Sequence, residues 1–281
     1  MFLIDPHVHM VSRTTTDYEN MAMAGVVAVS EPAFWAGFDR SPAAFSDYYR
    51  QLTEFEPTRA ASFGIRHFCW ICLNPKEAED LGKAREVLSL IPDFLSRPNV
   101  LGVGEIGLHK NTPHEMEVFR RHVQLAIDAG AARGGPHALI LIHTPHLADK
   151  LKGTRLILDM LREFGAAIDP ARVLIDHVEE HTISMVKDAG YWAGMTIYPT
   201  TKATPERAID MIEVYGAEQM CINAAADWGI SDPLWIHRTM LEAQRRGQNR
   251  AALIRLFHNN PASFFGQHPG FSIRPIEVVE K

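Results

Sequence analysis

The sequence predicts an α/β protein with a TIM-type (β/α)8 barrel fold, formed by a single domain that spans residues 1–281. Three observations lead to this prediction. Short runs of apolar and β-branched residues recur along the chain, a segment with helical spacing of apolar residues follows most of them, and the runs number eight. An open doubly wound sheet is the alternative, but it favours a glycine-rich phosphate loop after the first strand, which this sequence lacks.

The eight predicted strands are apolar almost throughout, as expected of parallel strands that are covered on both faces. Gly, Pro, Asp or His residues flank them, and these residues are typical of strand ends. The predicted strands are Phe2–Asp5, Val26–Val29, Phe63–Ile71, Val100–Gly104, Ala138–Ile142, Val173–Asp176, Trp192–Ile197 and Met220–Asn223. The predicted helices are Pro75–Leu90, His114–Ala131, Leu147–Phe164, His181–Ala189, Pro205–Tyr215, Pro233–Gln244 and Arg250–Phe257.

The longest interval between predicted elements is Glu31–Ala61, which separates the second strand from the third. It is rich in aromatic residues, namely Phe34, Trp35, Phe38, Phe45, Tyr48 and Tyr49. Such a segment either closes over a substrate pocket as a lid or forms a helix packed on the barrel. The sequence favours neither interpretation.

The composition is that of a globular protein with a sizeable core, with 46% hydrophobic and 22% charged residues. No apolar run reaches the roughly 18–20 residues that cross a membrane, and the first residues lack the features of a signal peptide. We therefore expect a cytoplasmic protein with no membrane partner. The three cysteines, Cys69, Cys72 and Cys221, are too few for a disulfide framework, and we interpret them as buried free thiols.

The formal net charge is −6 when the 14 histidines are counted as neutral. This acidic balance gives no support to a general nucleic-acid-binding surface, since such surfaces are basic. A small molecule or a phosphoester is therefore the favoured substrate, and nucleic acid is a less favoured alternative.

Histidine and carboxylate residues, which are common metal ligands, follow several predicted strands at their C-terminal ends. The first strand leads into His7-Val8-His9, where the two histidines share one face of an extended chain. The other candidates are Glu105 after the fourth strand, His143 after the fifth, His177 after the sixth and Asp227 after the eighth. One polar residue at a strand end is commonly a structural cap, but five such ends at the active-site face of a barrel indicate a metal centre.

These candidates divide into two ligand sets joined by one carboxylate. We predict that His7, His9 and Asp227 hold one divalent ion, that His143 and His177 hold a second, and that Glu105 bridges the two. Asp227 is also a candidate to accept a proton, so Asp227 and Glu105 are the predicted catalytic residues. Asp5 is a candidate to orient one histidine. The mixed donor set predicts one or two divalent ions, with Zn, Mn, Mg, Fe and Co as the candidates.

The order of these motifs resembles that of the TatD-like metal-dependent hydrolases of the amidohydrolase superfamily. The HxH at His7–His9, the sequence Gly-Glu-Ile-Gly-Leu at 104–108 and the closing Asn260–Gly266 carry the resemblance. It implies a TIM-type barrel, one or two divalent cations, and often a DNase-like activity. Carried over by position, it implies the same six metal residues: His7, His9, Glu105, His143, His177 and Asp227.

The sequence also departs from the pattern of that family. His109 stands where an Asp is usual, and Thr144-Pro145-His146 replaces a segment that usually contains an Arg. The missing Arg removes a natural phosphate clamp. The resemblance is thus to a divergent branch, in which the metal chemistry carries over better than the substrate does.

Further candidates are expected to contact substrate, although each also has a purely structural explanation. They are Glu31, His109, His146, Lys202 and Trp228. Taken together, the sequence predicts a metal-dependent hydrolase of an ester, phosphoester, lactone or amide bond in a small molecule. The alternatives are a DNase-like phosphodiesterase and a non-catalytic metal-binding interaction barrel.

Overall fold

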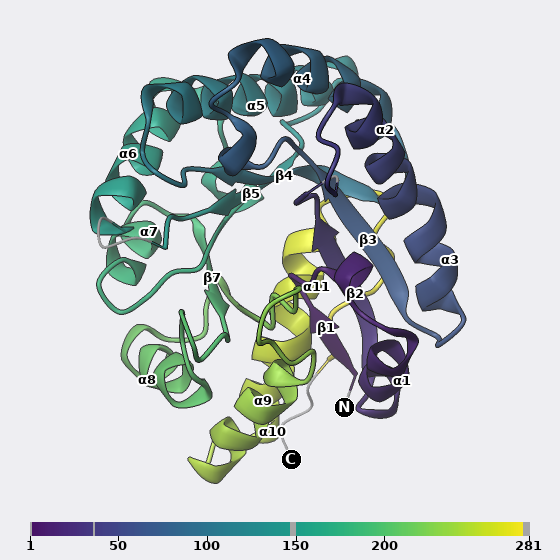
Figure 1. Ribbon diagram of the computed structural model, residues 1–281. Coiled ribbons are helices and arrows are strands. Elements are labelled where there is room, and N and C mark those ends of the chain that lie inside the picture. Colours follow the sequence, from purple (N-terminus) through teal and green to yellow (C-terminus); the bar gives the residue numbers. More distant parts are fainter. Residues whose placement is uncertain (1, 36, 147–149, 278–281) are drawn as a thin grey trace.

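Eight parallel strands form one sheet in which each strand pairs with the next along the chain (Figure 1). The computed structural model describes residues 2–35, 37–146 and 150–277. The strands are β1 (Leu3–Asp5), β2 (Val26–Pro32), β3 (Arg66–Ile71), β4 (Val100–Gly107), β5 (Leu139–His143), β6 (Val173–Asp176), β7 (Trp192–Thr196) and β8 (Met220–Asn223).

The sheet closes on itself through hydrogen bonds just beyond the last and first strands. Ala225 N donates to His7 O at 2.8 Å, and His9 N donates to Ala226 O at 2.7 Å. The eight strands therefore form a nearly closed barrel, which confirms the predicted TIM-type fold.

Most of the helices surround the barrel on its outside, whereas α11 lies within their ring in this view (Figure 1). The α-helices of the described residues are α1 (Thr15–Met23), α2 (Pro42–Arg50), α3 (Glu56–Ala61), α4 (Leu81–Leu95), α5 (Pro113–Ala132), α6 (Lys150–Glu163), α7 (Ile183–Asp188), α8 (Pro205–Tyr215), α9 (Trp235–Arg245), α10 (Arg250–Ile254) and α11 (Asn260–Phe265). The predicted helix Pro75–Leu90 was placed too early, because the Asp80 side chain accepts from Lys83 N and caps α4 there. The first residues of the predicted helix Leu147–Phe164, 147–149, lie outside the described residues.

The aromatic interval between β2 and β3 is largely helical. It contains α2, a π-helical segment (Gln51–Phe55) and α3, and the rings of Phe45, Tyr48 and Tyr49 are buried. The helix interpretation therefore holds for residues 42–61. Phe34, which precedes these helices, lies instead at the mouth of the barrel.

Alternation along the strands separates the barrel interior from the layer between sheet and helices. In β5, Leu139 and Leu141 belong to the inner cluster, which Phe264 and Phe265 of α11 also join. Ile140 and Ile142 pack in the outer cluster with the helices. His143 continues the inward phase, so its imidazole points into the barrel mouth.

The three cysteines are buried and free, as predicted. Among the helices of the described ranges, we find none with the length and apolar character that a membrane crossing requires.

Candidate metal centre

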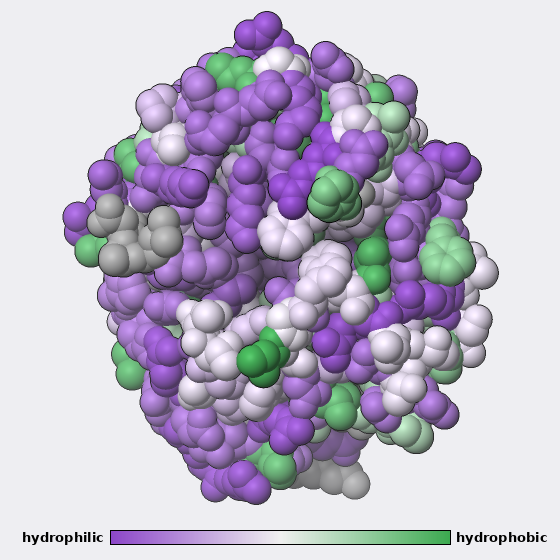
Figure 2. Space-filling view, in the orientation of Figure 1, coloured by the Kyte–Doolittle hydropathy of each residue, from purple (hydrophilic) through white to green (hydrophobic). Residues whose placement is uncertain are grey.

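A cavity of about 240 Å³ lies at the C-terminal ends of the strands. The space-filling view shows a hollow near the middle of this face, surrounded largely by hydrophilic side chains (Figure 2). Nine of the predicted site residues line the cavity: His7, His9, Glu105, His109, His143, His146, His177, Lys202 and Asp227. Its wall further includes Phe34, Asn74, Pro75, Lys76, Tyr198, Thr200, Thr201, Ala225 and Ile230.

Glu105 lies at the centre of the predicted ligands. Its Oε2 is 3.1 Å from His177 Nε2, 3.5 Å from His143 Nδ1 and 3.6 Å from His7 Nε2. The glycines of the Gly-Glu-Ile-Gly motif allow β4 to approach β5 this closely. A Cβ at Gly107 would lie only 2.0 Å from His143 O, so no larger residue fits there.

His7 is held in one orientation by a buried carboxylate that our sequence analysis missed. Its Nδ1 lies 2.6 Å from Asp176 Oδ2, and its Nε2 faces His9 Nε2 at 3.1 Å. Asp176 is fully buried and also accepts from Asn223 Nδ2 at 2.9 Å. A carboxylate on the remote nitrogen fixes the tautomer of a ligand histidine, so Asp176 has the role that we expected of Asp5.

Asp5 serves the backbone instead. Its Oδ1 accepts from His7 N at 3.2 Å and from Ala224 N at 3.3 Å. These contacts join the ends of β1 and β8, so Asp5 shapes the chain that carries His7 without touching its ring.

His177 is oriented in the same manner by a hydroxyl group. Its Nδ1 lies 2.6 Å from Thr196 Oγ1, which leaves Nε2 to face Glu105. The backbone of His177 adopts a φ of 61°, in the left-handed region, and its N–H donates to Asp176 Oδ1 at 2.7 Å. This turn directs the ring back over the barrel mouth.

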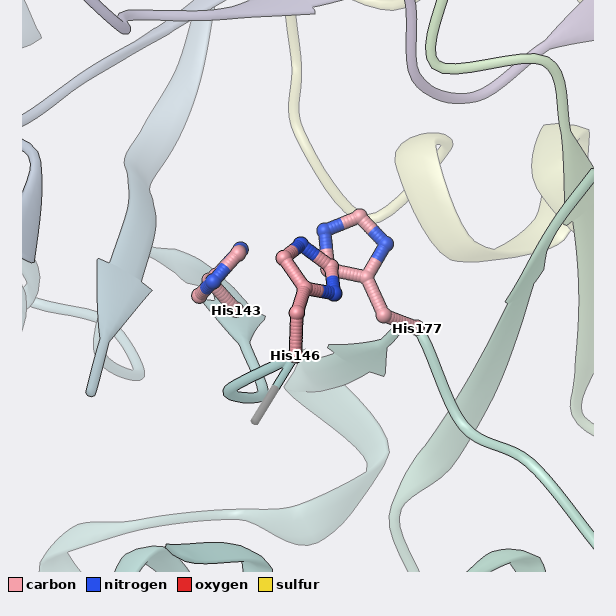
Figure 3. A group of neighbouring side chains, drawn as sticks. All are labelled: His143, His146 and His177. Atoms are coloured by element: carbon pink, nitrogen blue, oxygen red, sulfur yellow. The ribbon is translucent and has the colours of Figure 1, made fainter. Parts of the chain in front are cut away.

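His143 and His177 belong to a group of three histidines that point toward one another (Figure 3). The third member is His146, whose ring centroid lies 4.8 Å from that of His143 and 5.2 Å from that of His177. One ring nitrogen from each residue falls within 4.8 Å of the other two. His7, His9 and Glu105 form a second group that meets the same criterion.

Burial and neighbouring charges shift the pKa values of this centre, and for Glu105 they act in opposite directions. Burial alone would raise the pKa of Glu105, but the facing imidazoles of His143 and His7 hold it well below its ordinary value. Burial lowers the pKa of His143, and burial together with His7 lowers that of His9 to about 3. Burial would lower the pKa of His7, but Glu105 and Asp176 raise it. Metal ions bind the ionised carboxylate and the neutral imidazole, so a cation bound here would compete with a proton on His7.

Asp227 lies on the cavity wall but outside both groups of converging ligand atoms. Its Oδ1 accepts from Gly229 N at 2.8 Å and from Tyr198 Oη at 3.2 Å. Its place in the cavity agrees with a role near the reacting atoms, whereas its place in the first ligand set stays a prediction.

Glu31 does not lie in the cavity, contrary to our expectation of substrate contact. Strand β2 continues to Pro32, and Glu31 has the outward phase of Val29. It is fully buried behind the barrel, where its Oε2 lies 2.8 Å from His67 Nε2 and its Oε1 accepts from Val11 N at 2.9 Å. With both oxygens engaged there, Glu31 supports the loop after His9 and is not part of the cavity lining.

Trp228 stands at the rim as part of an aromatic cluster. Its ring centroid lies 5.7 Å from that of Phe34 and 6.0 Å from that of Trp35, and half of the residue is exposed. It also lies 6.1 Å from the ring of His9. The cluster therefore gives one side of the cavity mouth an apolar surface, although Trp228 does not line the cavity itself.

The side chains present fit a metal centre. His7 Nε2 and His9 Nε2 are 3.1 Å apart, near the roughly 3.3 Å expected for two imidazoles on one tetrahedral zinc ion. His143 Nδ1 is buried and has no hydrogen-bond partner among the described residues. A buried nitrogen without a partner is costly in a folded protein, and a cation at this position would satisfy it.

The chain is similar in sequence to a metal-dependent hydrolase. The sequence is 28% identical, over 266 residues, to an uncharacterized metal-dependent hydrolase of Methanocaldococcus jannaschii, with 94% of this chain and 99% of the relative covered. No protein-family model matches the sequence. This full-length similarity confirms the predicted resemblance to metal-dependent hydrolases.

Solved structures show the same fold. A TatD-like protein from Archaeoglobus fulgidus superimposes with a TM-score of 0.74 at 24% identity, covering 94% of this chain and 99% of the other. A β-aspartyl dipeptidase from Fervidobacterium islandicum covers 93% of this chain with a TM-score of 0.65, and the match takes in 74% of that protein. A protein engineered for organophosphate hydrolysis from a lactonase template gives 0.64, covering 94% of this chain and 95% of the other. The last two are 16% and 15% identical to this chain.

Proposed function

We propose that this chain hydrolyses an ester, phosphoester, lactone or amide bond in a small, negatively charged molecule, with two divalent cations bound at the barrel mouth. The observation that carries the proposal is the convergence of four imidazoles on one buried carboxylate, Glu105. In this assignment His7, His9 and Asp227 hold one cation, His143 and His177 hold the other, and Glu105 contacts both.

Divalent cations held by these residues would supply Lewis-acid polarisation of a substrate oxygen and would lower the pKa of water toward neutral. The protein's own groups then orient the reactants and move the proton. Asp227 is the candidate proton acceptor, because Tyr198 and Gly229 fix its Oδ1 while no described residue donates to its Oδ2. The buried Asp176 and Thr196 keep the rings of His7 and His177 in place during the reaction.

Two lysines favour a substrate with a negative charge. Lys76 and Lys202 both line the cavity, and the lysine ion pairs found among the described residues, Lys83–Glu77 and Lys150–Glu179, involve neither. Lys76 Nζ instead lies 4.8 Å from the ring centroid of Trp35. Ammonium groups that form no ion pair with a carboxylate of the described residues are suited to hold a carboxylate or phosphate of the substrate.

The size of the cavity favours small molecules over nucleic acid. A volume of about 240 Å³ is slightly below the roughly 300 Å³ at which the range of small-ligand sites begins. The aromatic cluster of Phe34, Trp35 and Trp228 offers an apolar surface beside the charged wall. The substrate that fits best therefore combines an anionic group with an apolar portion.

Metal content tests the proposal directly. Protein purified without chelators or an affinity metal should contain close to two transition-metal ions per chain by elemental analysis. Chelation should abolish hydrolysis of 4-nitrophenyl esters and phosphates, and added Zn²⁺, Mn²⁺ or Co²⁺ should restore it. Metal content near zero with no uptake would contradict the proposal. Salt-sensitive cleavage of oligonucleotides without small-ester turnover would favour the nuclease alternative.

Replacing Lys202 with methionine should weaken the binding of anionic substrates selectively. We expect KM for 4-nitrophenyl phosphate to rise about tenfold or more, because a charged contact contributes roughly 1.5–3 kcal/mol. KM for the neutral 4-nitrophenyl acetate should change little. Steady-state kinetics on both substrates measures the difference, and Lys152→Met, at an exposed position on α6, is the control. Equal changes for both substrates would show that Lys202 does not recognise charge.

A further inference from the structure

The group of His143, His146 and His177 has one member that the two ligand sets do not use. His146 lies at the solvent-accessible edge of the cavity, beyond the end of β5. Its ring is perpendicular to that of His143, with an interplanar angle of 90°, and tilted by 47° to that of His177. Figure 3 shows the three rings pointing toward a common space.

The chain before His146 is fixed by buried contacts. Thr144 is fully buried, and its hydroxyl lies 2.8 Å from Asp176 O and 3.2 Å from His177 O, so it bonds the end of β5 to the end of β6. Pro145 packs against Gly153 of α6, where an added Cβ would lie 2.3 Å from Pro145 Cγ. The close approach of helix and loop thus requires glycine at position 153, and it sets His146 beside His177.

We propose that His146 is the third imidazole ligand of the second cation, which then binds to His143, His146, His177 and Glu105. This inference rests on the proposed metal-dependent function and adds a ligand to one of its two sites. The donors are three ring nitrogens and the carboxylate oxygen that lies 3.1 Å from His177 Nε2 and 3.5 Å from His143 Nδ1.

The donor set predicts which ions this site selects. Three imidazoles and one carboxylate favour zinc or cobalt over magnesium, which prefers oxygen ligands. The first site has fewer converging donors, because Asp227 lies outside the group formed by His7, His9 and Glu105. The two sites should therefore differ in affinity, with His143, His146 and His177 holding the tighter ion.

Titration of metal-free protein with Co²⁺ tests the assignment without an activity assay. Equilibrium dialysis with elemental analysis gives the two dissociation constants, and the visible absorption of Co²⁺ reports its coordination. In His146→Phe we expect one ion to bind as in the wild type and the Kd of the other to rise by about 100-fold or more. The absorption bands of that site should weaken. His109→Phe, which alters a cavity histidine outside both ligand groups, should bind Co²⁺ as the wild type does.

The possible results separate this inference from the function on which it rests. Two ions bound to His146→Phe with wild-type affinities and spectrum would overturn the role of His146 and leave the proposed hydrolase intact. Wild-type protein that takes up no Co²⁺ would overturn both. His146→Asn provides a smaller, polar second variant, and circular dichroism checks that each variant is folded. The same loss of the tighter ion in both variants would support the ligand role.

Discussion

Replacing Glu105 with glutamine is expected to disrupt both metal sites at once. Its Oε2 lies 3.1–3.6 Å from nitrogens of three histidines that belong to the two proposed sites. Glutamine preserves the shape but removes the negative charge, so neither cation retains an anionic ligand at the shared position. We expect the metal content to fall from two ions to one or none. The rate of hydrolysis should fall by more than about 100-fold, because even the loss of a residue that only contacts a metal ligand lowers activity by up to about 100-fold.

The variant and the wild-type protein are dialysed in the same buffer, and elemental analysis of both measures the loss of metal. Glu56→Gln is a matched control, because Glu56 is also a fully buried carboxylate but contacts Tyr18 and Arg59 outside the cavity. The control should keep both ions even if its stability falls. Retention of two ions and full activity in Glu105→Gln would rule out the bridging role.

The sequence predicted the barrel because its strands have a regular physical signature. Buried parallel strands are apolar on both faces, and eight such runs are hard to accommodate otherwise. The same regularity places side chains correctly when the strand itself carries them. His143 continues the inward phase of Leu139 and Leu141, and Glu105 lies within β4, whose glycines bring that strand close to β5.

For two residues, the alternation of inward and outward side chains along a strand was not followed to the end of the strand. Glu31 was expected to contact substrate, but it lies within β2, and its outward phase buries it against His67. Asp176 was overlooked beside His177, although it shares the inward phase of Leu174. Alternation along the strands would have identified both.

Loop geometry explains what the sequence could not supply. His177 and Ala225 adopt positive φ angles of 61° and 40°, which are rare for non-glycine residues. The neighbouring sequence does not predict these angles. Asp227 comes two residues after Ala225, and its Oδ1 is held by Tyr198 from the β7 loop. The distance between Asp227 and the histidines therefore depends on tertiary contacts between loops.

Replacing Asp176 with asparagine is expected to weaken metal binding although Asp176 is not a predicted ligand. Burial would raise the pKa of this carboxyl, but His177 and His7 hold it well below its usual range, so the group is an anion. Asparagine removes the negative charge that fixes His7 Nδ1, and it places an amide group opposite the Asn223 Nδ2 donor. We expect metal affinity to fall 10–100-fold, and stability to fall by about 3–5 kcal/mol as a buried pair is broken.

A substitution on the neighbouring strand distinguishes the orienting effect of Asp176 on His7 from the effect of its negative charge. Gly194 of β7 leaves room for the carboxylate, since a Cβ there would lie 2.4 Å from Asp176 Oδ1. Gly194→Ala should therefore displace Asp176 with its charge intact, and metal affinity measured by Co²⁺ titration should fall in the same direction. Asp128→Asn, an exposed carboxylate on α5, controls for net charge. Wild-type affinity in both Asp176→Asn and Gly194→Ala would mean that His7 needs no oriented tautomer to bind its ion.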